Sequence, residues 1–498
     1  MSAELKSIFI EYADRVSSLS QRVAILPDKK RHISDLVQDI EKGPEFHKLV
    51  LATRDEFGHT GNRRNESAWR RAVGNVLRRS GFYIYILEKN LHDPSEEFEK
   101  YVHVFKSPKK KISYLGLLEY VSFEQDDIDF GNFQIKRFSR DDLDSILGNS
   151  INEIFYPWAA VDLNQIEDYW FIYLQQSIQV KKIIPSTKVD YTKIFSDDSY
   201  SRVEMTYTPR PFPEPLESVI KPLVLFDWQT DYWRGGPADE KEEKATGWMG
   251  FNIPFVLKVT DILYEPSFPA PSPEKLDKTI ERVTENGEEI WGPEFHISLD
   301  KQETESFITV VKRTHENLQK LDLEKSGWHF FNNAFDMLVK AFFTGGLEQL
   351  LWHITAIDAL LGERGGGLTK KLSRRIAFIL GETEQKQKEL QSRFEKLYNF
   401  RSALVHGKID SKESKDKQKN RVYISHLREA RDFARQTIVW FLEFLLKIQD
   451  GISQSQGNIE FPKRDLLLKL LDMDATERSQ LKTLLQILPP DFPHLLGK

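Results

Sequence analysis

The chain has 498 residues, no cysteine and a formal net charge of −6, and these values exclude several classes of protein. Without cysteine it can form no disulfide, use no thiolate nucleophile and hold no cysteine-ligated zinc ion. The mild negative charge excludes a uniformly basic nucleic-acid-binding surface, so any such site would have to be a local basic patch. The length exceeds the ~250–300 residues of one hydrophobic core and therefore predicts several domains.

The beginning of the chain and its hydropathy bear on localisation. The first residues, MSAELKSIFIEYADRV, contain acids and lack the apolar core of a signal peptide. The sequence contains no run of the ~18 apolar residues that a transmembrane helix needs, so no membrane partner is expected. We therefore expect a soluble protein of the cytoplasm.

In chain order, the first two regions differ in their hydrophobic spacing. Residues 1–110 follow helical spacing and predict an N-terminal helical region. Residues 111–275 are rich in β-branched and aromatic residues and predict a β-rich sensing or scaffold domain, with PLVLFDWQ (222–229) among its strands. SRDDLDSILG (139–148) predicts a short helix with Ser139 as its N-cap. Four prolines within 265–275 predict a linker.

Helical spacing returns in the last two regions. Residues 300–452 predict several helices joined by short connections, which is typical of an antiparallel bundle. Residues 453–498 predict a helical tail with two small helices. Glycines stand where these helices should end, at Gly346, Gly362, Gly381 and Gly407. The predicted fold class is thus α+β and multidomain, mainly α, with a β-rich N-terminal and middle region before a C-terminal helical bundle.

Candidate catalytic residues come from arginine–histidine pairs spaced five positions apart. The chain contains three such pairs, Arg54/His59, Arg401/His406 and Arg421/His426. The first lies in a loop-like context and the third at the front of a long amphipathic helix, so solvated surface is the favoured interpretation of both. His406 differs because Gly407 stops its helix, and a helix C-terminus favours the imidazolium by ~0.3–1 kcal/mol. From the residues alone, an RNA-cutting pair and an ordinary helix end are equally well supported.

Three segments around this pair resemble a known family. LEQLLWHITAIDALLG (347–362), TKKLSRRIAFILG (369–381) and LYNFRSALVHG (397–407) are similar, in order and spacing, to the Apea-like branch of the HEPN superfamily. The similarity covers residues 300–450, about a third of the chain. Two positions depart from the family pattern. Asp358 stands where many relatives have Glu, and Ser402 stands where the wider superfamily often has Asn, His or Asp.

The resemblance implies a HEPN-type bundle that cleaves RNA without a metal ion or other cofactor. In that chemistry the ribose 2′-OH attacks the adjacent phosphate. His406 would act as general acid or base and Arg401 would stabilise the phosphate charge, while Asp358 and Ser402 would support them. One histidine per chain leaves a second proton-transfer role unfilled, and family members dimerise, so a homodimer through the bundle is expected. A helix-packing carboxylate is an equally good interpretation of Asp358.

Basic side chains near this site are candidates for contacts with RNA. The predicted RNA-binding residues are Lys370, Lys371, Arg374 and Arg375. The last three of these share one helical face. A second basic set in the N-terminal region is more simply interpreted as a solvated helix face, and its members are Arg70, Arg71, Arg78 and Arg79.

The predicted function is a metal-independent HEPN endoribonuclease. It would act as a toxin or as an antiviral effector of abortive infection, restrained until its N-terminal region recognises a phage-derived or other trigger. Two alternatives stay open at this point: a non-catalytic HEPN module that binds RNA or nucleotide, and a structural dimerisation bundle. An intact Arg401/His406 pair favours catalysis, because a binding module would not need both residues.

Overall fold

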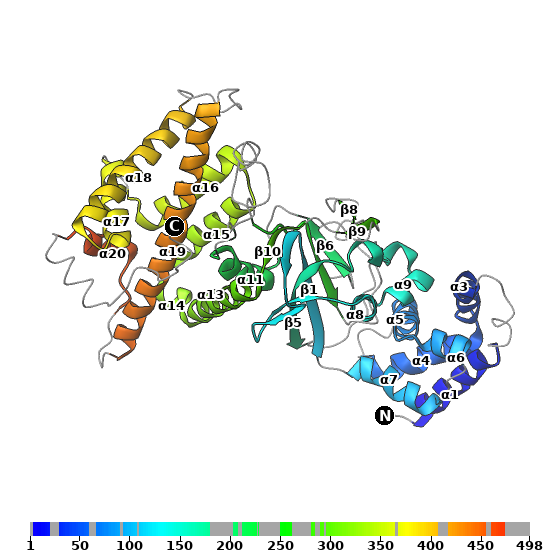
Figure 1. Cartoon of the computed structure of the whole chain (residues 1–498). Coiled ribbons are helices and arrows are strands. Elements are labelled where there is room, and N and C mark those ends of the chain that lie inside the picture. Colours follow the sequence, from blue (N-terminus) through cyan, green and yellow to red (C-terminus); the bar gives the residue numbers. More distant parts are fainter. Residues whose placement is uncertain are drawn as a thin grey trace. The chain divides into compact units, whose positions relative to one another are not determined.

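The protein is mainly helical, with a small antiparallel sheet in its N-terminal and middle part. The computed structural model describes residues 3–19, 29–58, 66–89, 93–106, 109–179, 203–207, 212–226, 228, 250–260, 280–283, 289–292, 295–363, 367–406, 417–454 and 460–473 (Figure 1). The predicted linker at 265–275 and the second small helix of the predicted tail lie outside these residues. Among the residues described here, no helix has the length and apolar character needed to cross a membrane.

Contacts divide the chain into two compact units. The N-terminal unit comprises residues 1–119, 126–212 and 253–294, and the C-terminal unit comprises residues 120–125, 213–252 and 295–498. Two stretches of the predicted β-rich region, residues 120–125 and 213–252, therefore belong with the C-terminal helices. Tyr120, where the chain passes between the units, has a positive φ of 66°.

Helices open the N-terminal unit, as the spacing predicted. They are α1 (Ala3–Ser17), α3 (Lys29–Ile40), α4 (Pro44–Phe57), α5 (Glu66–Arg79), α6 (Phe82–Lys89) and α7 (Pro94–Lys106). Their apolar faces meet in one core, where the Phe9 ring lies 5.4 Å from that of Phe98 and 5.0 Å from that of Tyr101. Each such buried side chain contributes roughly 1.5–3 kcal/mol.

Of the basic set on α5, only Arg71 is exposed, and the other three arginines do not lie on a solvated face. Arg79 is buried with 2% of its surface exposed, and Arg78 forms an ion pair with Glu41. Arg70 donates a hydrogen bond to the backbone carbonyl of Glu41. The sequence interpretation was wrong here because the partner, Glu41, lies 37 residues before Arg78 and helical spacing cannot reveal it.

A six-stranded antiparallel sheet follows in the same unit. Its strands are β1 (Lys109–Leu118), β3 (Asp127–Asp129), β4 (Gln134–Arg137), β5 (Trp170–Gln179), β6 (Val203–Tyr207) and β7 (Phe255–Thr260). They lie in the order β3-β4-β5-β1-β7-β6, so β1 is central, and Gly116 pairs with Ile172 on one side and Val256 on the other. One further hairpin joins β8 (Ile280–Val283) to β9 (Glu289–Gly292).

Short helices connect β4 to β5 and confirm one prediction. Helix α8 (Arg140–Leu147) begins after Ser139, whose side chain accepts a hydrogen bond from the backbone N–H of Asp142 at 3.2 Å. Such a cap satisfies one of the free N–H groups of the first turn. Helix α9 (Asn149–Phe155) and the 3₁₀ turns η1 (Pro157–Ala159) and η2 (Leu163–Gln165) follow.

The C-terminal unit combines one parallel strand pair with helices. Strand β2 (Tyr120–Phe123) pairs with β10 (Phe295–Leu299). The helices are α11 (Glu214–Val224), α13 (Lys301–Lys320), α14 (Leu323–Ser326), α15 (His329–Phe342), α16 (Gly346–Leu361), α17 (Leu368–Leu380), α18 (Glu384–Val405), α19 (Lys417–Gln454) and α20 (Arg464–Leu471). Helices α18 and α19 are antiparallel, since Phe394 contacts Phe433 while Phe400 contacts His426.

Two predictions about this unit were wrong. Residues 222–224, predicted as the start of a strand, end α11, because a short apolar run fits a buried helix as well as a strand. Gly346 begins α16 with a φ of 59° instead of ending α15. Gly362 and Gly381 are C-caps as predicted, and Gly407 lies outside the described residues.

Candidate functional site

The candidate site is built on the C-terminal end of α18. The helix begins at its N-cap Thr383, whose side chain accepts a hydrogen bond from the Lys386 N–H at 3.2 Å. Phe394 and Leu397 are buried and form the apolar side of this helix. The helix ends at His406, whose backbone N–H donates to the Ser402 carbonyl at 3.1 Å. His406 is therefore the C-cap of α18, one residue beyond the last helical turn in which the sequence placed it.

The two predicted catalytic side chains leave α18 in different directions. His406 is exposed, whereas Arg401 is half-buried. Five helical residues separate two positions by roughly 7.5 Å along the axis and about 140° around it. Arg401 therefore faces the interior of the helical unit, while His406 is open to solvent at the helix end.

Arg401 faces Asp358, the predicted supporting carboxylate on α16. The positive charge of Arg401 acts on Asp358, and the arginine lies 5.8 Å from the ring centre of Tyr398. Both polar groups are incompletely satisfied: Nε of Arg401 and Oδ1 of Asp358 are buried and have no hydrogen-bond partner among the described residues. A buried polar atom without a partner costs roughly 1–3 kcal/mol, so two together mark an energetically unfavourable place in the fold.

The environment changes the acidity of both neighbours. Burial raises the pKa of the Asp358 carboxyl to about 6, although the charges of Arg401 and Arg464 oppose that rise. Burial, and then the negative charge of Asp358, also raises the pKa of Tyr398. Asp358 is therefore ionised at neutral pH but can gain a proton in mildly acidic solution.

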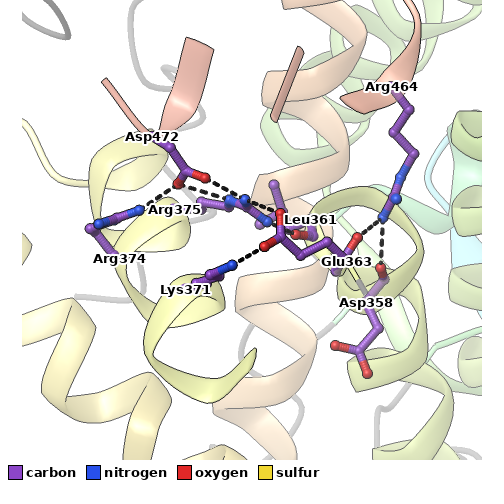
Figure 2. Close-up of polar contacts among 9 residues, drawn as sticks. Asp358, Leu361, Glu363, Lys371, Arg374, Arg375, Arg464 and Asp472 are labelled. Carbon is purple, nitrogen blue, oxygen red and sulfur yellow. Dashed lines mark hydrogen bonds and ion pairs between the residues drawn. The ribbon is translucent and has the colours of Figure 1, made fainter. Parts of the chain in front are cut away.

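The end of α16 is held by Arg464 from the start of α20. Its guanidinium donates to the carbonyls of Asp358 at 3.2 Å and of Ala359 at 3.0 Å, and also to that of Gly362. The Asp358 carbonyl also accepts the C-cap hydrogen bond from the Gly362 N–H at 2.8 Å, so Arg464 adds a second donor to the end of α16. Figure 2 shows Arg464 meeting the backbone of Asp358, whereas the Asp358 carboxylate extends the other way.

The predicted RNA-binding residues on α17 are mostly engaged in ion pairs. Arg375 has 0% of its side chain exposed and bonds to both Glu363 and Asp472. Arg374 bonds to Asp472 at 2.7 Å, and Lys371 pairs with Glu363. Lys370 is exposed. In this arrangement Arg375 offers no surface to RNA, because Glu363 and Asp472 cover it. The sequence could show which helical face Arg375 lies on, but not which acids would pack against that face.

The remaining predicted residues are placed as follows. Ser402 is half-buried and contributes its backbone carbonyl to the cap at His406. His426, from another of the three arginine–histidine pairs, packs against Phe400 with ring centres 4.4 Å apart and the planes tilted by 38°, and it contacts Glu429 at 3.4 Å. His59 lies outside the described residues. The packed and hydrogen-bonded position of His426 agrees with a structural role.

Sequence reasoning missed three participants, Tyr398, Arg464 and Asp472. Tyr398 precedes Arg401 by three residues, so helical spacing could have placed the two on one face. Arg464 and Asp472 lie about a hundred residues from their partners in the chain, and no local pattern connects them. Within the described part of the chain, no group of three or more His, Asp or Glu residues is arranged to hold a metal ion.

Comparisons of the chain with models of protein families, with curated proteins and with solved structures found no match.

Proposed function

We propose that the protein is a metal-independent endoribonuclease whose catalytic residues are Arg401 and His406. The observation that supports this most directly is the end of α18. There an exposed histidine caps the helix, one and a half turns after an arginine that has a buried Nε without a partner. A guanidinium donor that no described acceptor engages can donate to a phosphate oxygen instead. The resemblance of residues 347–407 to Apea-like HEPN proteins agrees with this assignment.

The chemistry follows from the two side chains. A base removes the proton of a ribose 2′-OH, and the oxygen attacks the adjacent phosphorus. The P–O5′ bond breaks, and an acid delivers a proton to the departing 5′-oxygen. The products are a 2′,3′-cyclic phosphate and a 5′-hydroxyl. His406 supplies one of the proton transfers, an effect worth about 10²–10⁴ in rate, and the Arg401 guanidinium stabilises the charge on the phosphate oxygens.

Asp358 has a positioning role in this proposal. Its charge attracts Arg401 from α16 without forming the close hydrogen-bonded pair that would hold the arginine in place. Arg401 can therefore turn its guanidinium toward a phosphate at a modest cost. This role explains why the fold keeps a buried carboxylate whose ionisation is unfavourable.

The active species in this proposal is a homodimer. One catalytic histidine per chain can serve as base or as acid, so a second copy would complete the site. Light scattering at working concentration should report about twice the 58.2 kDa of one chain. A monomer with full activity would contradict the composite site. The further proposal of a toxin or abortive-infection effector rests on the resemblance, with a trigger acting through the N-terminal unit.

The decisive experiment is incubation of the purified protein with total RNA in the presence of EDTA, followed by mapping of the new ends. We expect cleavage to persist and to leave 2′,3′-cyclic phosphate and 5′-hydroxyl ends. Loss of cleavage in EDTA, or 5′-phosphate ends, would contradict the mechanism. RNA binding without cleavage in all conditions would favour the non-catalytic binding module instead.

A further inference from the structure

The C-terminal segment 460–472 occupies a basic cluster on α17. Its last residue, Asp472, lies between Arg374 and Arg375 and bonds to both (Figure 2). Nε of Arg375 donates to Oδ1 of Asp472 at 3.1 Å, while a second N–H of the same guanidinium donates to Oδ2. The contact is thus the two-pronged pairing of one guanidinium with both oxygens of one carboxylate.

This pairing has the same geometry as the recognition of a phosphodiester by arginine. A guanidinium presents two parallel N–H groups, and they fit two oxygens of a carboxylate or of a phosphate equally well. Burial alone would raise the pKa of Asp472, but hydrogen bonds from Arg375 and Arg374 outweigh it and hold that pKa below its ordinary value. Asp472 is therefore a permanent anion at neutral pH and a chemical stand-in for a phosphate group.

The charges of the cluster are nearly balanced while the segment is in place. Three cations, Lys371, Arg374 and Arg375, face two anions, Glu363 and Asp472. Loss of the Asp472 charge would leave the same three cations facing Glu363 alone. It would also uncover the N–H groups of Arg375 that now point at Asp472.

The segment is held by buried apolar side chains and by hydrogen bonds, including those from Arg464 to the end of α16. Leu467, Leu468 and Leu471 are buried, and the backbone carbonyl of Pro462 accepts a hydrogen bond from Trp328 at 2.9 Å. Helix α20 has eight residues, fewer than the ~12–15 that a helix needs to persist in water by itself. Its structure therefore depends on these contacts, and it should melt once they are lost.

We propose that Lys371, Arg374 and Arg375 form an anion site for the RNA backbone and that Asp472 blocks this site as an internal competitor. RNA binds there only when the phosphodiester displaces the carboxylate and segment 460–472 leaves α17. This inference rests on the proposed function, because it takes RNA as the ligand. It adds a reason why a nuclease of this kind could remain restrained in the resting state.

The first test measures RNA binding by an Asp472→Asn variant, which removes the charge and preserves the side-chain shape. The probe is a fluorescein-labelled single-stranded RNA with 2′-O-methyl riboses, which lacks the attacking hydroxyl and cannot be cut. We expect the Kd at low salt to fall about tenfold, which corresponds to ~1.4 kcal/mol. The slope of log K against log salt should steepen by about 0.7 for each added phosphate contact.

Two further variants make this test specific. Glu382→Gln removes one negative charge from an exposed position between α17 and α18 and should leave the Kd unchanged. Adding Arg374→Gln to the Asp472→Asn variant should raise the Kd again, since Arg374 is one of the cations that lose their ion pair with Asp472. An Asp472→Asn variant that binds RNA no better than Glu382→Gln would overturn the proposal.

A second measurement uses the unaltered chain and does not depend on any variant folding. Hydrogen exchange of residues 464–471 is followed by mass spectrometry with and without the uncleavable RNA. We expect RNA to speed exchange in α20, and unchanged or slower exchange would overturn the proposal. Both assays report binding rather than cleavage. A protein that passes them but leaves native RNA intact would therefore refute the nuclease and not the blocked anion site.

Discussion

Each unit of this protein buries a carboxylate, but the two carboxylates are treated in opposite ways. In the N-terminal unit Glu41 is 8% exposed, forms an ion pair with Arg78 and accepts a hydrogen bond from the Tyr83 hydroxyl at 3.2 Å. That hydroxyl also lies 2.7 Å from the hydroxyl of Tyr12. In the C-terminal unit neither Oδ1 of Asp358 nor Nε of the nearby Arg401 has a hydrogen-bond partner within the part of the chain that the structure describes.

Burial raises the pKa of both carboxyls, and the two carboxyls differ in their hydrogen-bond and ion-pair partners. A buried charge that is fully paired holds several helices in one arrangement. A buried charge without close partners destabilises the folded state, and its retention indicates another role. The comparison predicts that Glu41 serves stability and Asp358 serves function, and four experiments can break or sharpen it.

The largest effect is expected from Glu41→Ala in the N-terminal unit. Removing one partner of a buried ion pair leaves Arg78 without its counter-ion and typically costs about 3–5 kcal/mol. The free energy of unfolding, measured by urea denaturation, should fall by that amount. Glu11→Ala is the matched control, because Glu11 forms only an exposed ion pair with Lys48 and should change stability by less than about 1 kcal/mol. Equal losses in the two variants would contradict the structural role of Glu41.

The second effect concerns catalysis and should leave stability almost unchanged. His406→Ala should lower the rate of RNA cleavage by at least ~10², because a positioned acid or base is lost. Arg401→Ala should lower it by ~10²–10³ through loss of charge stabilisation. Cleavage rates are compared after circular dichroism has verified folding. The cleavage rate of His426→Ala should stay within a few-fold of the parent. If His426→Ala abolishes cleavage and His406→Ala does not, the Arg401/His406 pair is not the catalytic one.

The third prediction concerns Asp358, whose removal should raise the free energy of unfolding, whereas removal of Glu41 should lower it. The pKa of Asp358 in the folded protein is about 6, above its ordinary value of 3.8, so ionisation is less favourable in the folded state. The contribution of the neutral Asp358 carboxyl to the free energy of unfolding is fully present below pH ~4 and is lost as the pH rises through 6. Asp358→Ala should therefore raise the free energy of unfolding at pH 7.5 by about 1–3 kcal/mol.

Denaturation curves at pH 4, 5, 6 and 7.5 check this prediction. The gain in Asp358→Ala should appear between pH 4 and 6 and then remain constant, while RNA cleavage falls because Arg401 loses its positioning charge. A variant less stable than the parent at pH 7.5 would show that Asp358 is a structural residue like Glu41.

The smallest effect is expected from Ser402→Ala on α18. The described contact of Ser402 at the helix end is made by its backbone carbonyl, which alanine retains. The free energy of unfolding should change by less than about 0.5 kcal/mol, and the cleavage rate should stay within a few-fold. A tenfold loss of cleavage with unchanged thermal stability would indicate that the Ser402 hydroxyl contacts the substrate.

Local patterns in the sequence predicted many of the elements correctly. Ser139 caps α8, and Gly362 and Gly381 follow the ends of α16 and α17, each as the spacing indicated, while His406 is the C-cap of α18, one residue beyond its predicted place. These features depend on residues within a few positions of one another. Where the local signal was ambiguous, at 222–224 and Gly346, the prediction was wrong.

What the sequence determined by itself is therefore most of the helices, several strands within residues 111–275 and the position of the Arg401/His406 pair near one helix end. Tertiary structure alone decided which charges are free and which are neutralised. It buried Arg375 against Asp472, brought Arg78 to Glu41, and left Asp358 near Arg401 without a close partner. The physical reason is that capping and amphipathic spacing act over a few residues. The electrostatic state of a side chain depends instead on partners that the fold brings from any distance along the chain.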